Sequence, residues 1–104
     1  MSTTIVTVFR SRLRDDPRGY DATAEAMEAR ARVAPGFVDF KTFVADDGER
    51  VSLIVFESRA THDAWRADPV HVDAQRRGRR DWYAEYRIQV CELVAERVFP
   101  EPAR

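Results

Sequence analysis

The sequence has only one cysteine, Cys91, among its 104 residues. A single cysteine cannot form a disulfide within the chain, which is typical of proteins in a reducing compartment, and we expect a cytoplasmic location. No apolar stretch approaches the roughly 20 residues that a membrane-spanning helix needs. The amino-terminal residues also lack the basic region and apolar run of a signal peptide, so we expect no membrane partner.

An excess of charge of one sign is also lacking. The chain carries 17 Lys and Arg against 18 Asp and Glu, for a formal net charge of −1. No overall field therefore attracts nucleic acid or an anionic membrane. Four arginines do cluster between residues 76 and 80, but no nucleic-acid-reading motif accompanies them. We interpret them as the solvated face of a helix.

Motifs for metal and nucleotide cofactors are missing as well. The sequence contains no zinc-ligand spacing, no phosphate-binding glycine loop and no Gly-x-Ser-x-Gly turn. We expect His62 to be exposed and Cys91 to act as a small hydrophobic residue in a strand. The sequence thus predicts a protein without a metal or flavin cofactor.

What the sequence does contain is an alternation of strand and helix patterns. Runs of β-branched and aromatic residues predict strands over residues 3–10, 37–45, 50–57 and 86–95. Helical periodicity predicts helices over 18–33 and from Ser58 to Trp65, with a restart at Asp68-Pro69 that runs to about Glu85. This order is the α+β, ferredoxin-like β-α-β-β-α-β arrangement, a four-stranded antiparallel sheet with helices on one face. We expect one domain over residues 1–95 and a carboxy-terminal tail over 96–104.

The predicted strands are apolar on both faces. In the third strand Val51, Leu53 and Val55 alternate with Ile54 and Phe56. In the second strand we expect Phe37 and Phe43 on one face, with the other face formed by Val38, Phe40 and Val44. An antiparallel sheet with one wet face alternates apolar and polar residues, and two helices cover only one face. The sequence therefore predicts a homodimer in which a second copy covers the other face, with a small substrate cavity there as the alternative.

A series of short motifs between residues 35 and 94 resembles one known family. The motifs are Pro35-Gly36-Phe37, Asp47-Gly48, Phe56-Glu57-Ser58 leading to Trp65, Asp68-Pro69-Val70-His71, Ala74-Gln75, Gly78-Arg79 and Tyr83 to Tyr86. Their order and spacing resemble the antibiotic-biosynthesis-monooxygenase family, over nearly the whole chain. The resemblance implies a dimeric α+β barrel. Some members oxidise phenolic polyketides with molecular oxygen and no cofactor, others degrade haem, and many have no assigned activity.

The resemblance also points to Trp65. It matches the tryptophan that the family places at the end of the short helix, beside its pocket. In that role the indole is a flat wall for an aromatic substrate. The alternative is that Trp65 packs the helix onto the sheet.

One face of the last helix carries an unusual set of residues. His71, Gln75, Gly78 and Trp82 stand at i, i+4, i+7 and i+11. His71, with an ordinary pKa of about 6.5, is our candidate for accepting a phenolic proton. Gln75 is a candidate for a hydrogen bond to a substrate oxygen, Trp82 for a substrate contact, and Gly78 for leaving room for a ring. The alternative is a partly buried histidine bonded to a loop carbonyl, with Trp82 packing at the dimer edge.

Four further residues are weaker substrate-binding candidates. Tyr83 and Tyr86 flank the junction between helix and strand, where either one points into the pocket or both pack. Arg10 and Arg87 lie late in the first strand and early in the fourth. A guanidinium binds oxyanions well, but a surface ion pair is the competing role for each arginine.

The sequence departs from the family pattern in two ways. It contains no asparagine, whereas the characterised monooxygenases and the haem-degrading members both use a pocket asparagine. In the haem-degrading pattern the ligand histidine follows the tryptophan by about ten residues, where Gln75 stands here. His71 lies about one turn earlier, so haem ligation by it requires a different geometry.

These observations predict a cofactor-independent monooxygenase that acts on a phenol or hydroquinone. The substrate donates an electron to oxygen once it is deprotonated, inside a dry pocket that supplies a base and stabilises an oxyanion. Two alternatives stay open. One is haem binding or degradation, and the other is a non-catalytic dimeric module that binds a small molecule.

Overall fold

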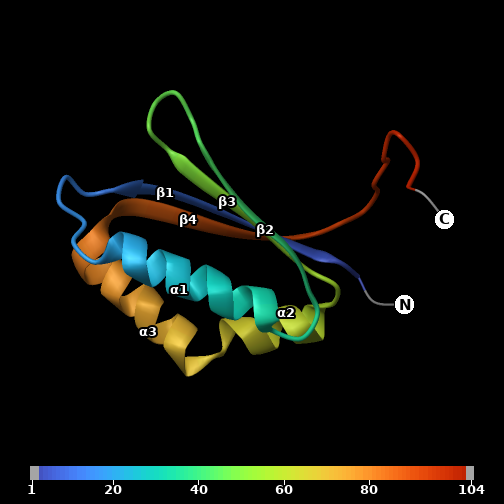
Figure 1. Ribbon diagram of the computed structural model, residues 1–104, viewed down its shortest axis with the longest axis horizontal. Coiled ribbons are helices and arrows are strands. Elements are labelled where there is room, and N and C mark those ends of the chain that lie inside the picture. Colours follow the sequence, from blue (N-terminus) through green and yellow to red (C-terminus); the bar gives the residue numbers. More distant parts are fainter. Residues whose placement is uncertain (1–2, 103–104) are drawn as a thin grey trace.

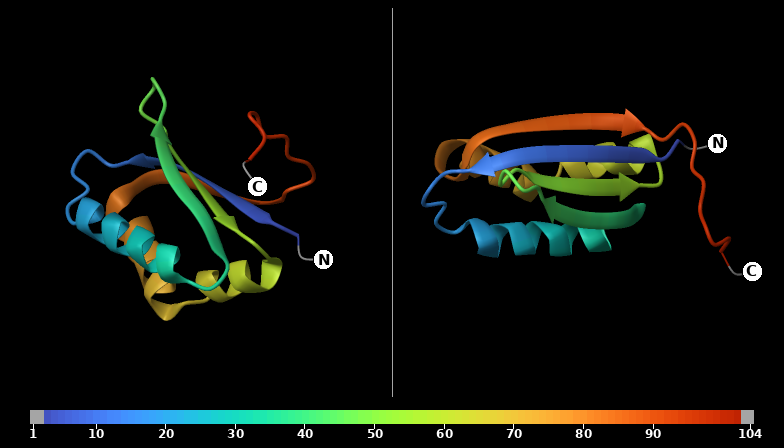
Figure 2. Two further views of the ribbon diagram at one scale, coloured as in Figure 1. Left: turned by 45° about the vertical axis from the view of Figure 1, so that its right-hand side comes forward. Right: turned by 90° about the horizontal axis from the view of Figure 1, so that it is seen from above.

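The computed structural model describes residues 3–102, and its elements follow the expected order. They are β1 (Ile5–Leu13), α1 (Tyr20–Val33), β2 (Phe37–Val44), β3 (Arg50–Phe56), α2 (Arg59–Arg66), α3 (Pro69–Arg77), the π-helical turn η1 (Gly78–Trp82) and β4 (Tyr83–Glu92). The sheet has the order β2-β3-β1-β4 with antiparallel neighbours. All helices lie on one face of the sheet (Figure 1, Figure 2). The predicted α+β ferredoxin-like arrangement is confirmed.

The strand register decides which side chains face the helices. Thr7 in β1 stands opposite Ile54 in β3 and Val90 in β4, and residues directly opposite one another share a face. The two fully buried large side chains, Ile5 and Phe56, are also register partners on this face. The core therefore lies between the centre of the sheet and the helices.

Two local signals place the break between α2 and α3 where the sequence predicts it. The Ser58 hydroxyl accepts a hydrogen bond from the amide of Thr61 (3.2 Å) and so caps α2. The Asp68 carboxylate accepts one from the amide of Val70 (2.8 Å), and Pro69 occupies the first turn of α3. Each cap satisfies an amide that the helix itself leaves without a partner.

The junction between the last helix and β4 differs from the prediction. The helix does not run to Glu85 but closes with the η1 turn at Trp82, where the amide of Tyr83 bonds to the carbonyl of Gly78. The strand then starts at Tyr83, three residues earlier than expected. Its first residues pair with the end of β1, so β1 also extends beyond Arg10 to Leu13. Pairing with β4 thus overrides the helical periodicity of the sequence.

The first residues of β2 correct the expected distribution of its side chains. Phe37 pairs with Phe56 and Asp39 pairs with Val55, so a register shift separates them. Such a bulge changes the face on which the following residues lie. Phe37 packs edge-to-face on Phe56 on the helix side, with ring centroids 6.0 Å apart, while Phe43 lies on the other side. The expectation that Phe37 and Phe43 share a face is wrong.

The second face of the sheet is not covered by the helices of this chain. Its apolar residues are Val6, Val8, Phe43, Val51, Leu53 and Val55. Phe43 exposes 48% of its surface there. Cys91, opposite Val6, lies on the same face and is exposed. This open face is largely apolar at its centre.

The chain leaves the sheet after Glu92. Residues 93–102 contain no helix or strand and run away from the body of the molecule (Figure 1). Val94 and Phe99 each expose 94% of their surface. Residues 96–102 of the predicted tail lie in this stretch. Residues 1, 2, 103 and 104, which the predicted ranges include, lie outside the described residues. No helix between residues 3 and 102 has the length and apolar character needed to cross a membrane.

Candidate active site

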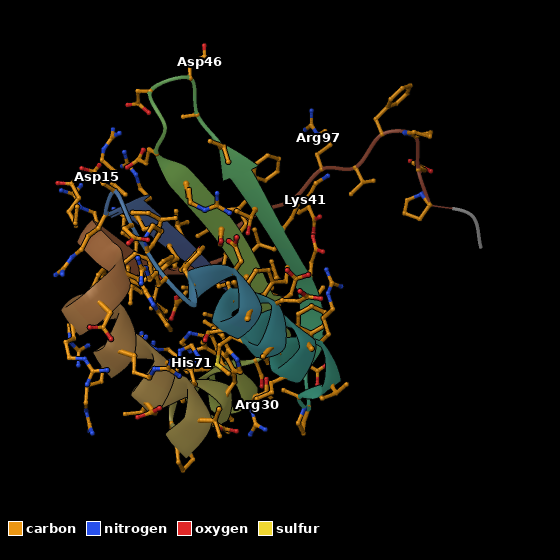
Figure 3. The ribbon with its side chains drawn as sticks, turned by 60° about the vertical axis from the view of Figure 1, so that its left-hand side comes forward. Asp15, Arg30, Lys41, Asp46, His71 and Arg97 are labelled. Atoms are coloured by element: carbon orange, nitrogen blue, oxygen red, sulfur yellow. The ribbon has the colours of Figure 1, made fainter. Side chains whose placement is uncertain are left out.

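A cavity of about 350 Å³ lies between the sheet and the helices. Its floor is the helix-facing side of the strands, including Thr7, Phe9 and Ile54, and its walls come from α1, α2, α3 and the start of β4. Six of the residues considered for the site line it together: Trp65, His71, Gln75, Trp82, Tyr83 and Tyr86. Figure 3 shows His71 on the side of α3 that faces α1. The structure thus brings these six side chains to one space.

Trp65 and His71 form the end of this cavity beside the break between α2 and α3. Their ring centroids are 4.6 Å apart, with the planes tilted by 46°. Trp65 also stacks on Phe56, with ring centroids 5.0 Å apart and planes inclined by 26°. Trp65 therefore packs α2 onto the sheet and also forms a cavity wall, so the two roles considered from the sequence coexist.

The surroundings of His71 hold its ring in the neutral form. Burial lowers the pKa of His71 from 6.5 to about 4, and the positive charge of Arg66 adds to this effect. Asp68 acts in the opposite direction but does not outweigh them. At neutral pH the imidazole therefore has a nitrogen lone pair available to accept a proton. It is a weaker base than the ordinary pKa assumed from the sequence.

Trp82 and Gly78 mainly serve the packing of the chain itself. The indole nitrogen of Trp82 donates a hydrogen bond to the carbonyl of Arg18 (2.8 Å), and only 3% of the residue is exposed. At Gly78, an added Cβ would overlap the ring of Tyr83. The space that we expected Gly78 to leave for a ligand is thus occupied by the chain's own tyrosine. Trp82 contributes apolar wall to the cavity, with its polar group already bonded.

Tyr83 and Tyr86 both line the cavity and pack with Phe9. The three ring centroids lie 5.5–5.8 Å from one another. Burial raises the pKa of Tyr83 well above its ordinary value. Its phenol therefore stays protonated and can donate a hydrogen bond to a ligand.

Arg10 and Arg87 lie elsewhere. They are register partners in β1 and β4 on the open face of the sheet, and neither lines the cavity. Arg10 makes two hydrogen bonds to the carboxylate of Glu49, at 2.9 and 3.1 Å. Alternation along β1 explains why Arg10 lies outside the cavity, because Phe9 points to the helices and Arg10 points away. Neither arginine is therefore placed to bind an oxyanion in this cavity, and Arg10 forms the ion pair that was considered as its alternative role.

His62 is a residue that sequence reasoning misplaced. It is buried, with 2% of its surface exposed, rather than exposed as expected. Its Nε2 lies 3.0 Å from the hydroxyl of Thr7, and its Nδ1 lies 2.9 Å from a carboxylate oxygen of Asp63. Thr7 lines the cavity and Asp63 is exposed, so a hydroxyl, an imidazole and a carboxylate connect the cavity wall to the surface. The available signal was the spacing to Trp65, three residues later on the same helix face.

Arg50 is a second residue that the prediction missed. It lines the cavity at the start of β3, and its guanidinium carbon lies 5.7 Å from the centroid of the Tyr20 ring. Alternation in β3 contained the signal, because Arg50 has the parity of Ser52, Ile54 and Phe56. A basic side chain on that face points towards the helices rather than to solvent.

A second hollow, of about 420 Å³, lies between α1, α2 and α3. It shares Met27, Trp65 and His71 with the cavity over the sheet. The ion pair of Arg30 and Asp68 (2.6 Å) lies in its wall. Trp65 and His71 thus line both spaces.

The described part of the chain offers no group of three or more His, Cys, Asp or Glu side chains placed to hold a metal ion. The groups that border a ligand in the cavity are aromatic rings, the imidazole of His71 and the guanidinium of Arg50. Such a site suits a planar organic molecule with a few polar groups.

Comparison with known proteins extends this result. No family model matches the chain. The uncharacterized protein YqjZ of Bacillus subtilis strain 168 is 30% identical over 94 residues, covering 90% of this chain and 82% of YqjZ. SnoaB, a cofactor-independent oxygenase from Streptomyces nogalater, superposes with a TM-score of 0.76 at 17% identity, covering 96% of this chain and all of SnoaB.

A further solved structure carries the name of the family suggested by the sequence motifs. It is a Nitrosomonas europaea protein described as a candidate antibiotic biosynthesis monooxygenase. It superposes with a TM-score of 0.76 at 13% identity, covering 98% of this chain and 97% of that protein. The chain belongs to one family with YqjZ, and it has the fold of the antibiotic-biosynthesis monooxygenases that its motifs resemble.

Proposed function

We propose that the chain binds a planar phenol or hydroquinone in the cavity and promotes its oxidation by molecular oxygen, without a cofactor. The observation that carries this proposal is the convergence of Trp65, His71 and Gln75 on one cavity of about 350 Å³. That volume is within the usual range for small-molecule sites. The description of SnoaB as a cofactor-independent oxygenase, on the same fold, adds support.

The proposed roles follow from the surroundings of each side chain. Trp65 provides a flat wall against which the substrate ring stacks. Neutral His71 accepts the phenolic proton, and the amide of Gln75 bonds a substrate oxygen. The electron-rich phenolate then reduces oxygen. When the reacting carbon is a CH₂ group, one oxygen atom becomes its carbonyl oxygen and the other leaves as water with the two hydrogens.

The lowered pKa of His71 sets a condition on this mechanism. With a pKa of about 4 in the empty cavity, an isolated His71 cation is unfavourable. A phenolate beside the ring favours the protonated form, because opposite charges attract strongly where water is excluded. The proton therefore stays on His71 only while the phenolate is next to it. The series of hydrogen-bonded side chains from Thr7 through His62 to Asp63 is a second possible proton acceptor at the cavity wall.

The open face of the sheet supports a homodimer as the working form. Its six apolar residues form a continuous surface that the chain's own helices leave uncovered. Soluble monomers rarely expose a large contiguous apolar patch. A second copy of the same sheet, related by a two-fold axis, is self-complementary to this face.

The test of the activity is oxygen uptake by the purified protein with a panel of hydroquinones and anthrone-like compounds. We expect uptake above the rate of spontaneous oxidation, and loss of the excess in the His71→Ala protein. Binding of panel compounds without uptake would identify a non-catalytic binding module instead. A titration with hemin separates the haem alternative, because stoichiometric binding would give a Soret band from ligated haem.

A further inference from the structure

Arg50 is a cation in the cavity wall that forms no ion pair with any residue between positions 3 and 102. It stands opposite Ser11 in β1 and Val44 in β2, on the helix-facing side of the sheet. Its Nε atom is buried and has no hydrogen-bond partner within residues 3–102. A buried donor without a partner is costly, and native structures contain few of them. This atom therefore calls for a partner that the described chain does not supply.

The charges near Arg50 do not neutralise it. The adjacent Glu49 carboxylate is bound to Arg10 on the other face of the sheet. Glu28, which lines the cavity from α1, is paired with Arg32 at 2.9 Å. Two further acidic residues of α1 line the cavity, Asp21 and Glu25, and both are exposed. Water screens the charges of exposed carboxylates, so they contribute little at a buried nitrogen.

The near neighbours of Arg50 are aromatic. Its guanidinium approaches the Tyr20 ring at 5.7 Å, and Tyr83 packs edge-to-face on the same ring at 5.9 Å. Aromatic faces hold a cation in place but do not saturate its hydrogen-bonding capacity. The result is a guanidinium that is fixed in orientation, partly desolvated and still able to bind an anion.

Arg50 and the Trp65–His71 pair mark opposite ends of the cavity. Arg50 is the first residue of β3, and Phe56, the last, stacks on Trp65. Six residues of extended strand correspond to roughly 20 Å between the two backbone positions. A ligand that reaches from the long side chain of Arg50 to His71 is therefore elongated, with different polar groups at its two ends.

We propose that the ligand of this cavity is an elongated aromatic acid whose carboxylate is bound by the guanidinium of Arg50. Its phenolic hydroxyl then points towards His71. A carboxylate suits this position because a guanidinium pairs with it through two parallel hydrogen bonds, one of which engages the unpaired nitrogen. The inference rests on the proposed function in taking the same cavity as the substrate site, and it adds the class of substrate.

The test compares two ligands that differ only in the carboxylate, 6-hydroxy-2-naphthoate and 2-naphthol. Binding is measured by isothermal titration calorimetry under nitrogen, so that no oxidation contributes. We expect the naphthoate to bind the unmodified protein about 10- to 100-fold more tightly, the usual effect of a hydrogen bond to a charged group. In the Arg50→Met protein this preference should disappear. The Arg76→Met protein, which loses an exposed arginine of α3 outside the cavity lining, should keep it.

Several outcomes would overturn the inference. They are equal binding of the two ligands, no binding of either one, a preference that survives Arg50→Met, or an equal loss in Arg76→Met. Arg50→Met should melt no lower than the unmodified protein, because it removes a buried charge without a partner. If this variant fails to fold, Arg50 has a structural role and the inference is wrong. Arg50→Lys, which keeps the charge but not the bidentate geometry, should retain only part of the preference, and full retention would contradict the proposed geometry.

The outcomes also separate this inference from the proposed function. If the protein prefers the naphthoate through Arg50 but consumes no oxygen with any hydroquinone, the aromatic-acid site is supported and the proposed oxidation of phenols is contradicted. If it oxidises neutral hydroquinones but binds both naphthalene ligands equally, the proposed function is supported and the aromatic-acid site is contradicted.

Discussion

The imidazole of His71 and the indole of Trp65 lie with their ring centroids 4.6 Å apart, and both rings line the same cavity. This contact joins two short helices, α2 and α3, that the chain separates at Asp68. A candidate base is thus held against a candidate substrate wall. The two residues should nevertheless differ in their kinetic roles.

Replacement of His71 by Ala should lower kcat by roughly 10²- to 10⁴-fold if the imidazole accepts the substrate proton. The measurement is oxygen uptake with the best substrate of the hydroquinone panel. The dimer should stay intact, because His71 lies on the helix side and not on the open face. Turnover at the unmodified rate would make His71 a packing residue. If His71→Ala unfolds, His71→Gln, which keeps a polar side chain of similar reach, is the variant that decides.

Trp65→Phe should raise KM more than it lowers kcat. The change removes area from the wall on which the substrate stacks but leaves the proton acceptor in place. The same substitution keeps an aromatic ring against Phe56, so the fold should persist. Steady-state kinetics over a range of substrate concentrations separate the two constants. A fall in kcat with unchanged KM would show that Trp65 acts in the chemical step.

Thr7→Val tests the second route for the proton. Valine has nearly the shape of threonine, but it removes the hydroxyl that lies 3.0 Å from His62. If protons leave the cavity through Thr7 and His62, kcat should fall and its solvent isotope effect should change. If His71 alone takes the proton, kcat should stay within about twofold of the unmodified value, and only the stability should fall by about 1 kcal/mol or more for the lost hydrogen bond.

The stability of the protein should fall in acid because of His71. Its pKa is about 4 in the folded chain and about 6.5 when unfolded, so the unfolded state binds more protons between these values. The contribution of neutral His71 is complete above pH 6.5 and is lost as the pH falls towards 4. Urea unfolding at pH 7 and pH 4.5 should show this loss, on the order of 1–2 kcal/mol after allowance for partial exposure.

The control for this pH effect is His71→Gln, which cannot titrate. Its stability should fall less between pH 7 and pH 4.5 than that of the unmodified protein. Other groups titrate equally in both proteins and cancel in the difference. An identical pH dependence of the two proteins would show that His71 is not held neutral by burial.

Sedimentation at micromolar concentration should give twice the 12.0 kDa mass of the chain. Leu53→Asp or Phe43→Asp should cause dissociation or unfolding, because a buried carboxylate without a partner costs about 3 kcal/mol or more. Asp39, already acidic and on the same face as Phe43, offers a matched control in the variant Asp39→Asn. A monomer in the unmodified protein would refute the face-to-face dimer.

The elements that the sequence predicts well are those with local causes. Asp68-Pro69 marks the start of α3 because a side-chain acceptor and a fixed φ act within one turn. Alternation placed Ile54 and Phe56 on one face of β3, which is the helix side in the structure, and it would have placed Arg50 on the same face had it been applied to a charged residue. These features depend on neighbours within a few residues.

The features that sequence reasoning missed depend on distant partners. The start of β4 at Tyr83 is set by pairing with Leu13, seventy positions away in the chain. The side on which Phe37 lies depends on a bulge against β3. Buried His62, in α2, has its hydrogen-bond partner in Thr7 of β1, 55 residues away in the chain. Periodicity within a single segment does not contain these contacts, although for His62 the spacing to Trp65 did indicate a shared helix face.

The wall that Trp65 and His71 form between the cavity over the sheet and the second hollow has a consequence for ligand exchange. Both residues, together with Met27, belong to the two spaces at once. A rotation of either aromatic ring would join the cavity over the sheet to the hollow between the three helices. When His71 is the ring that turns, the proton acceptor leaves the cavity, so the site would lack its base while a ligand exchanges along that route.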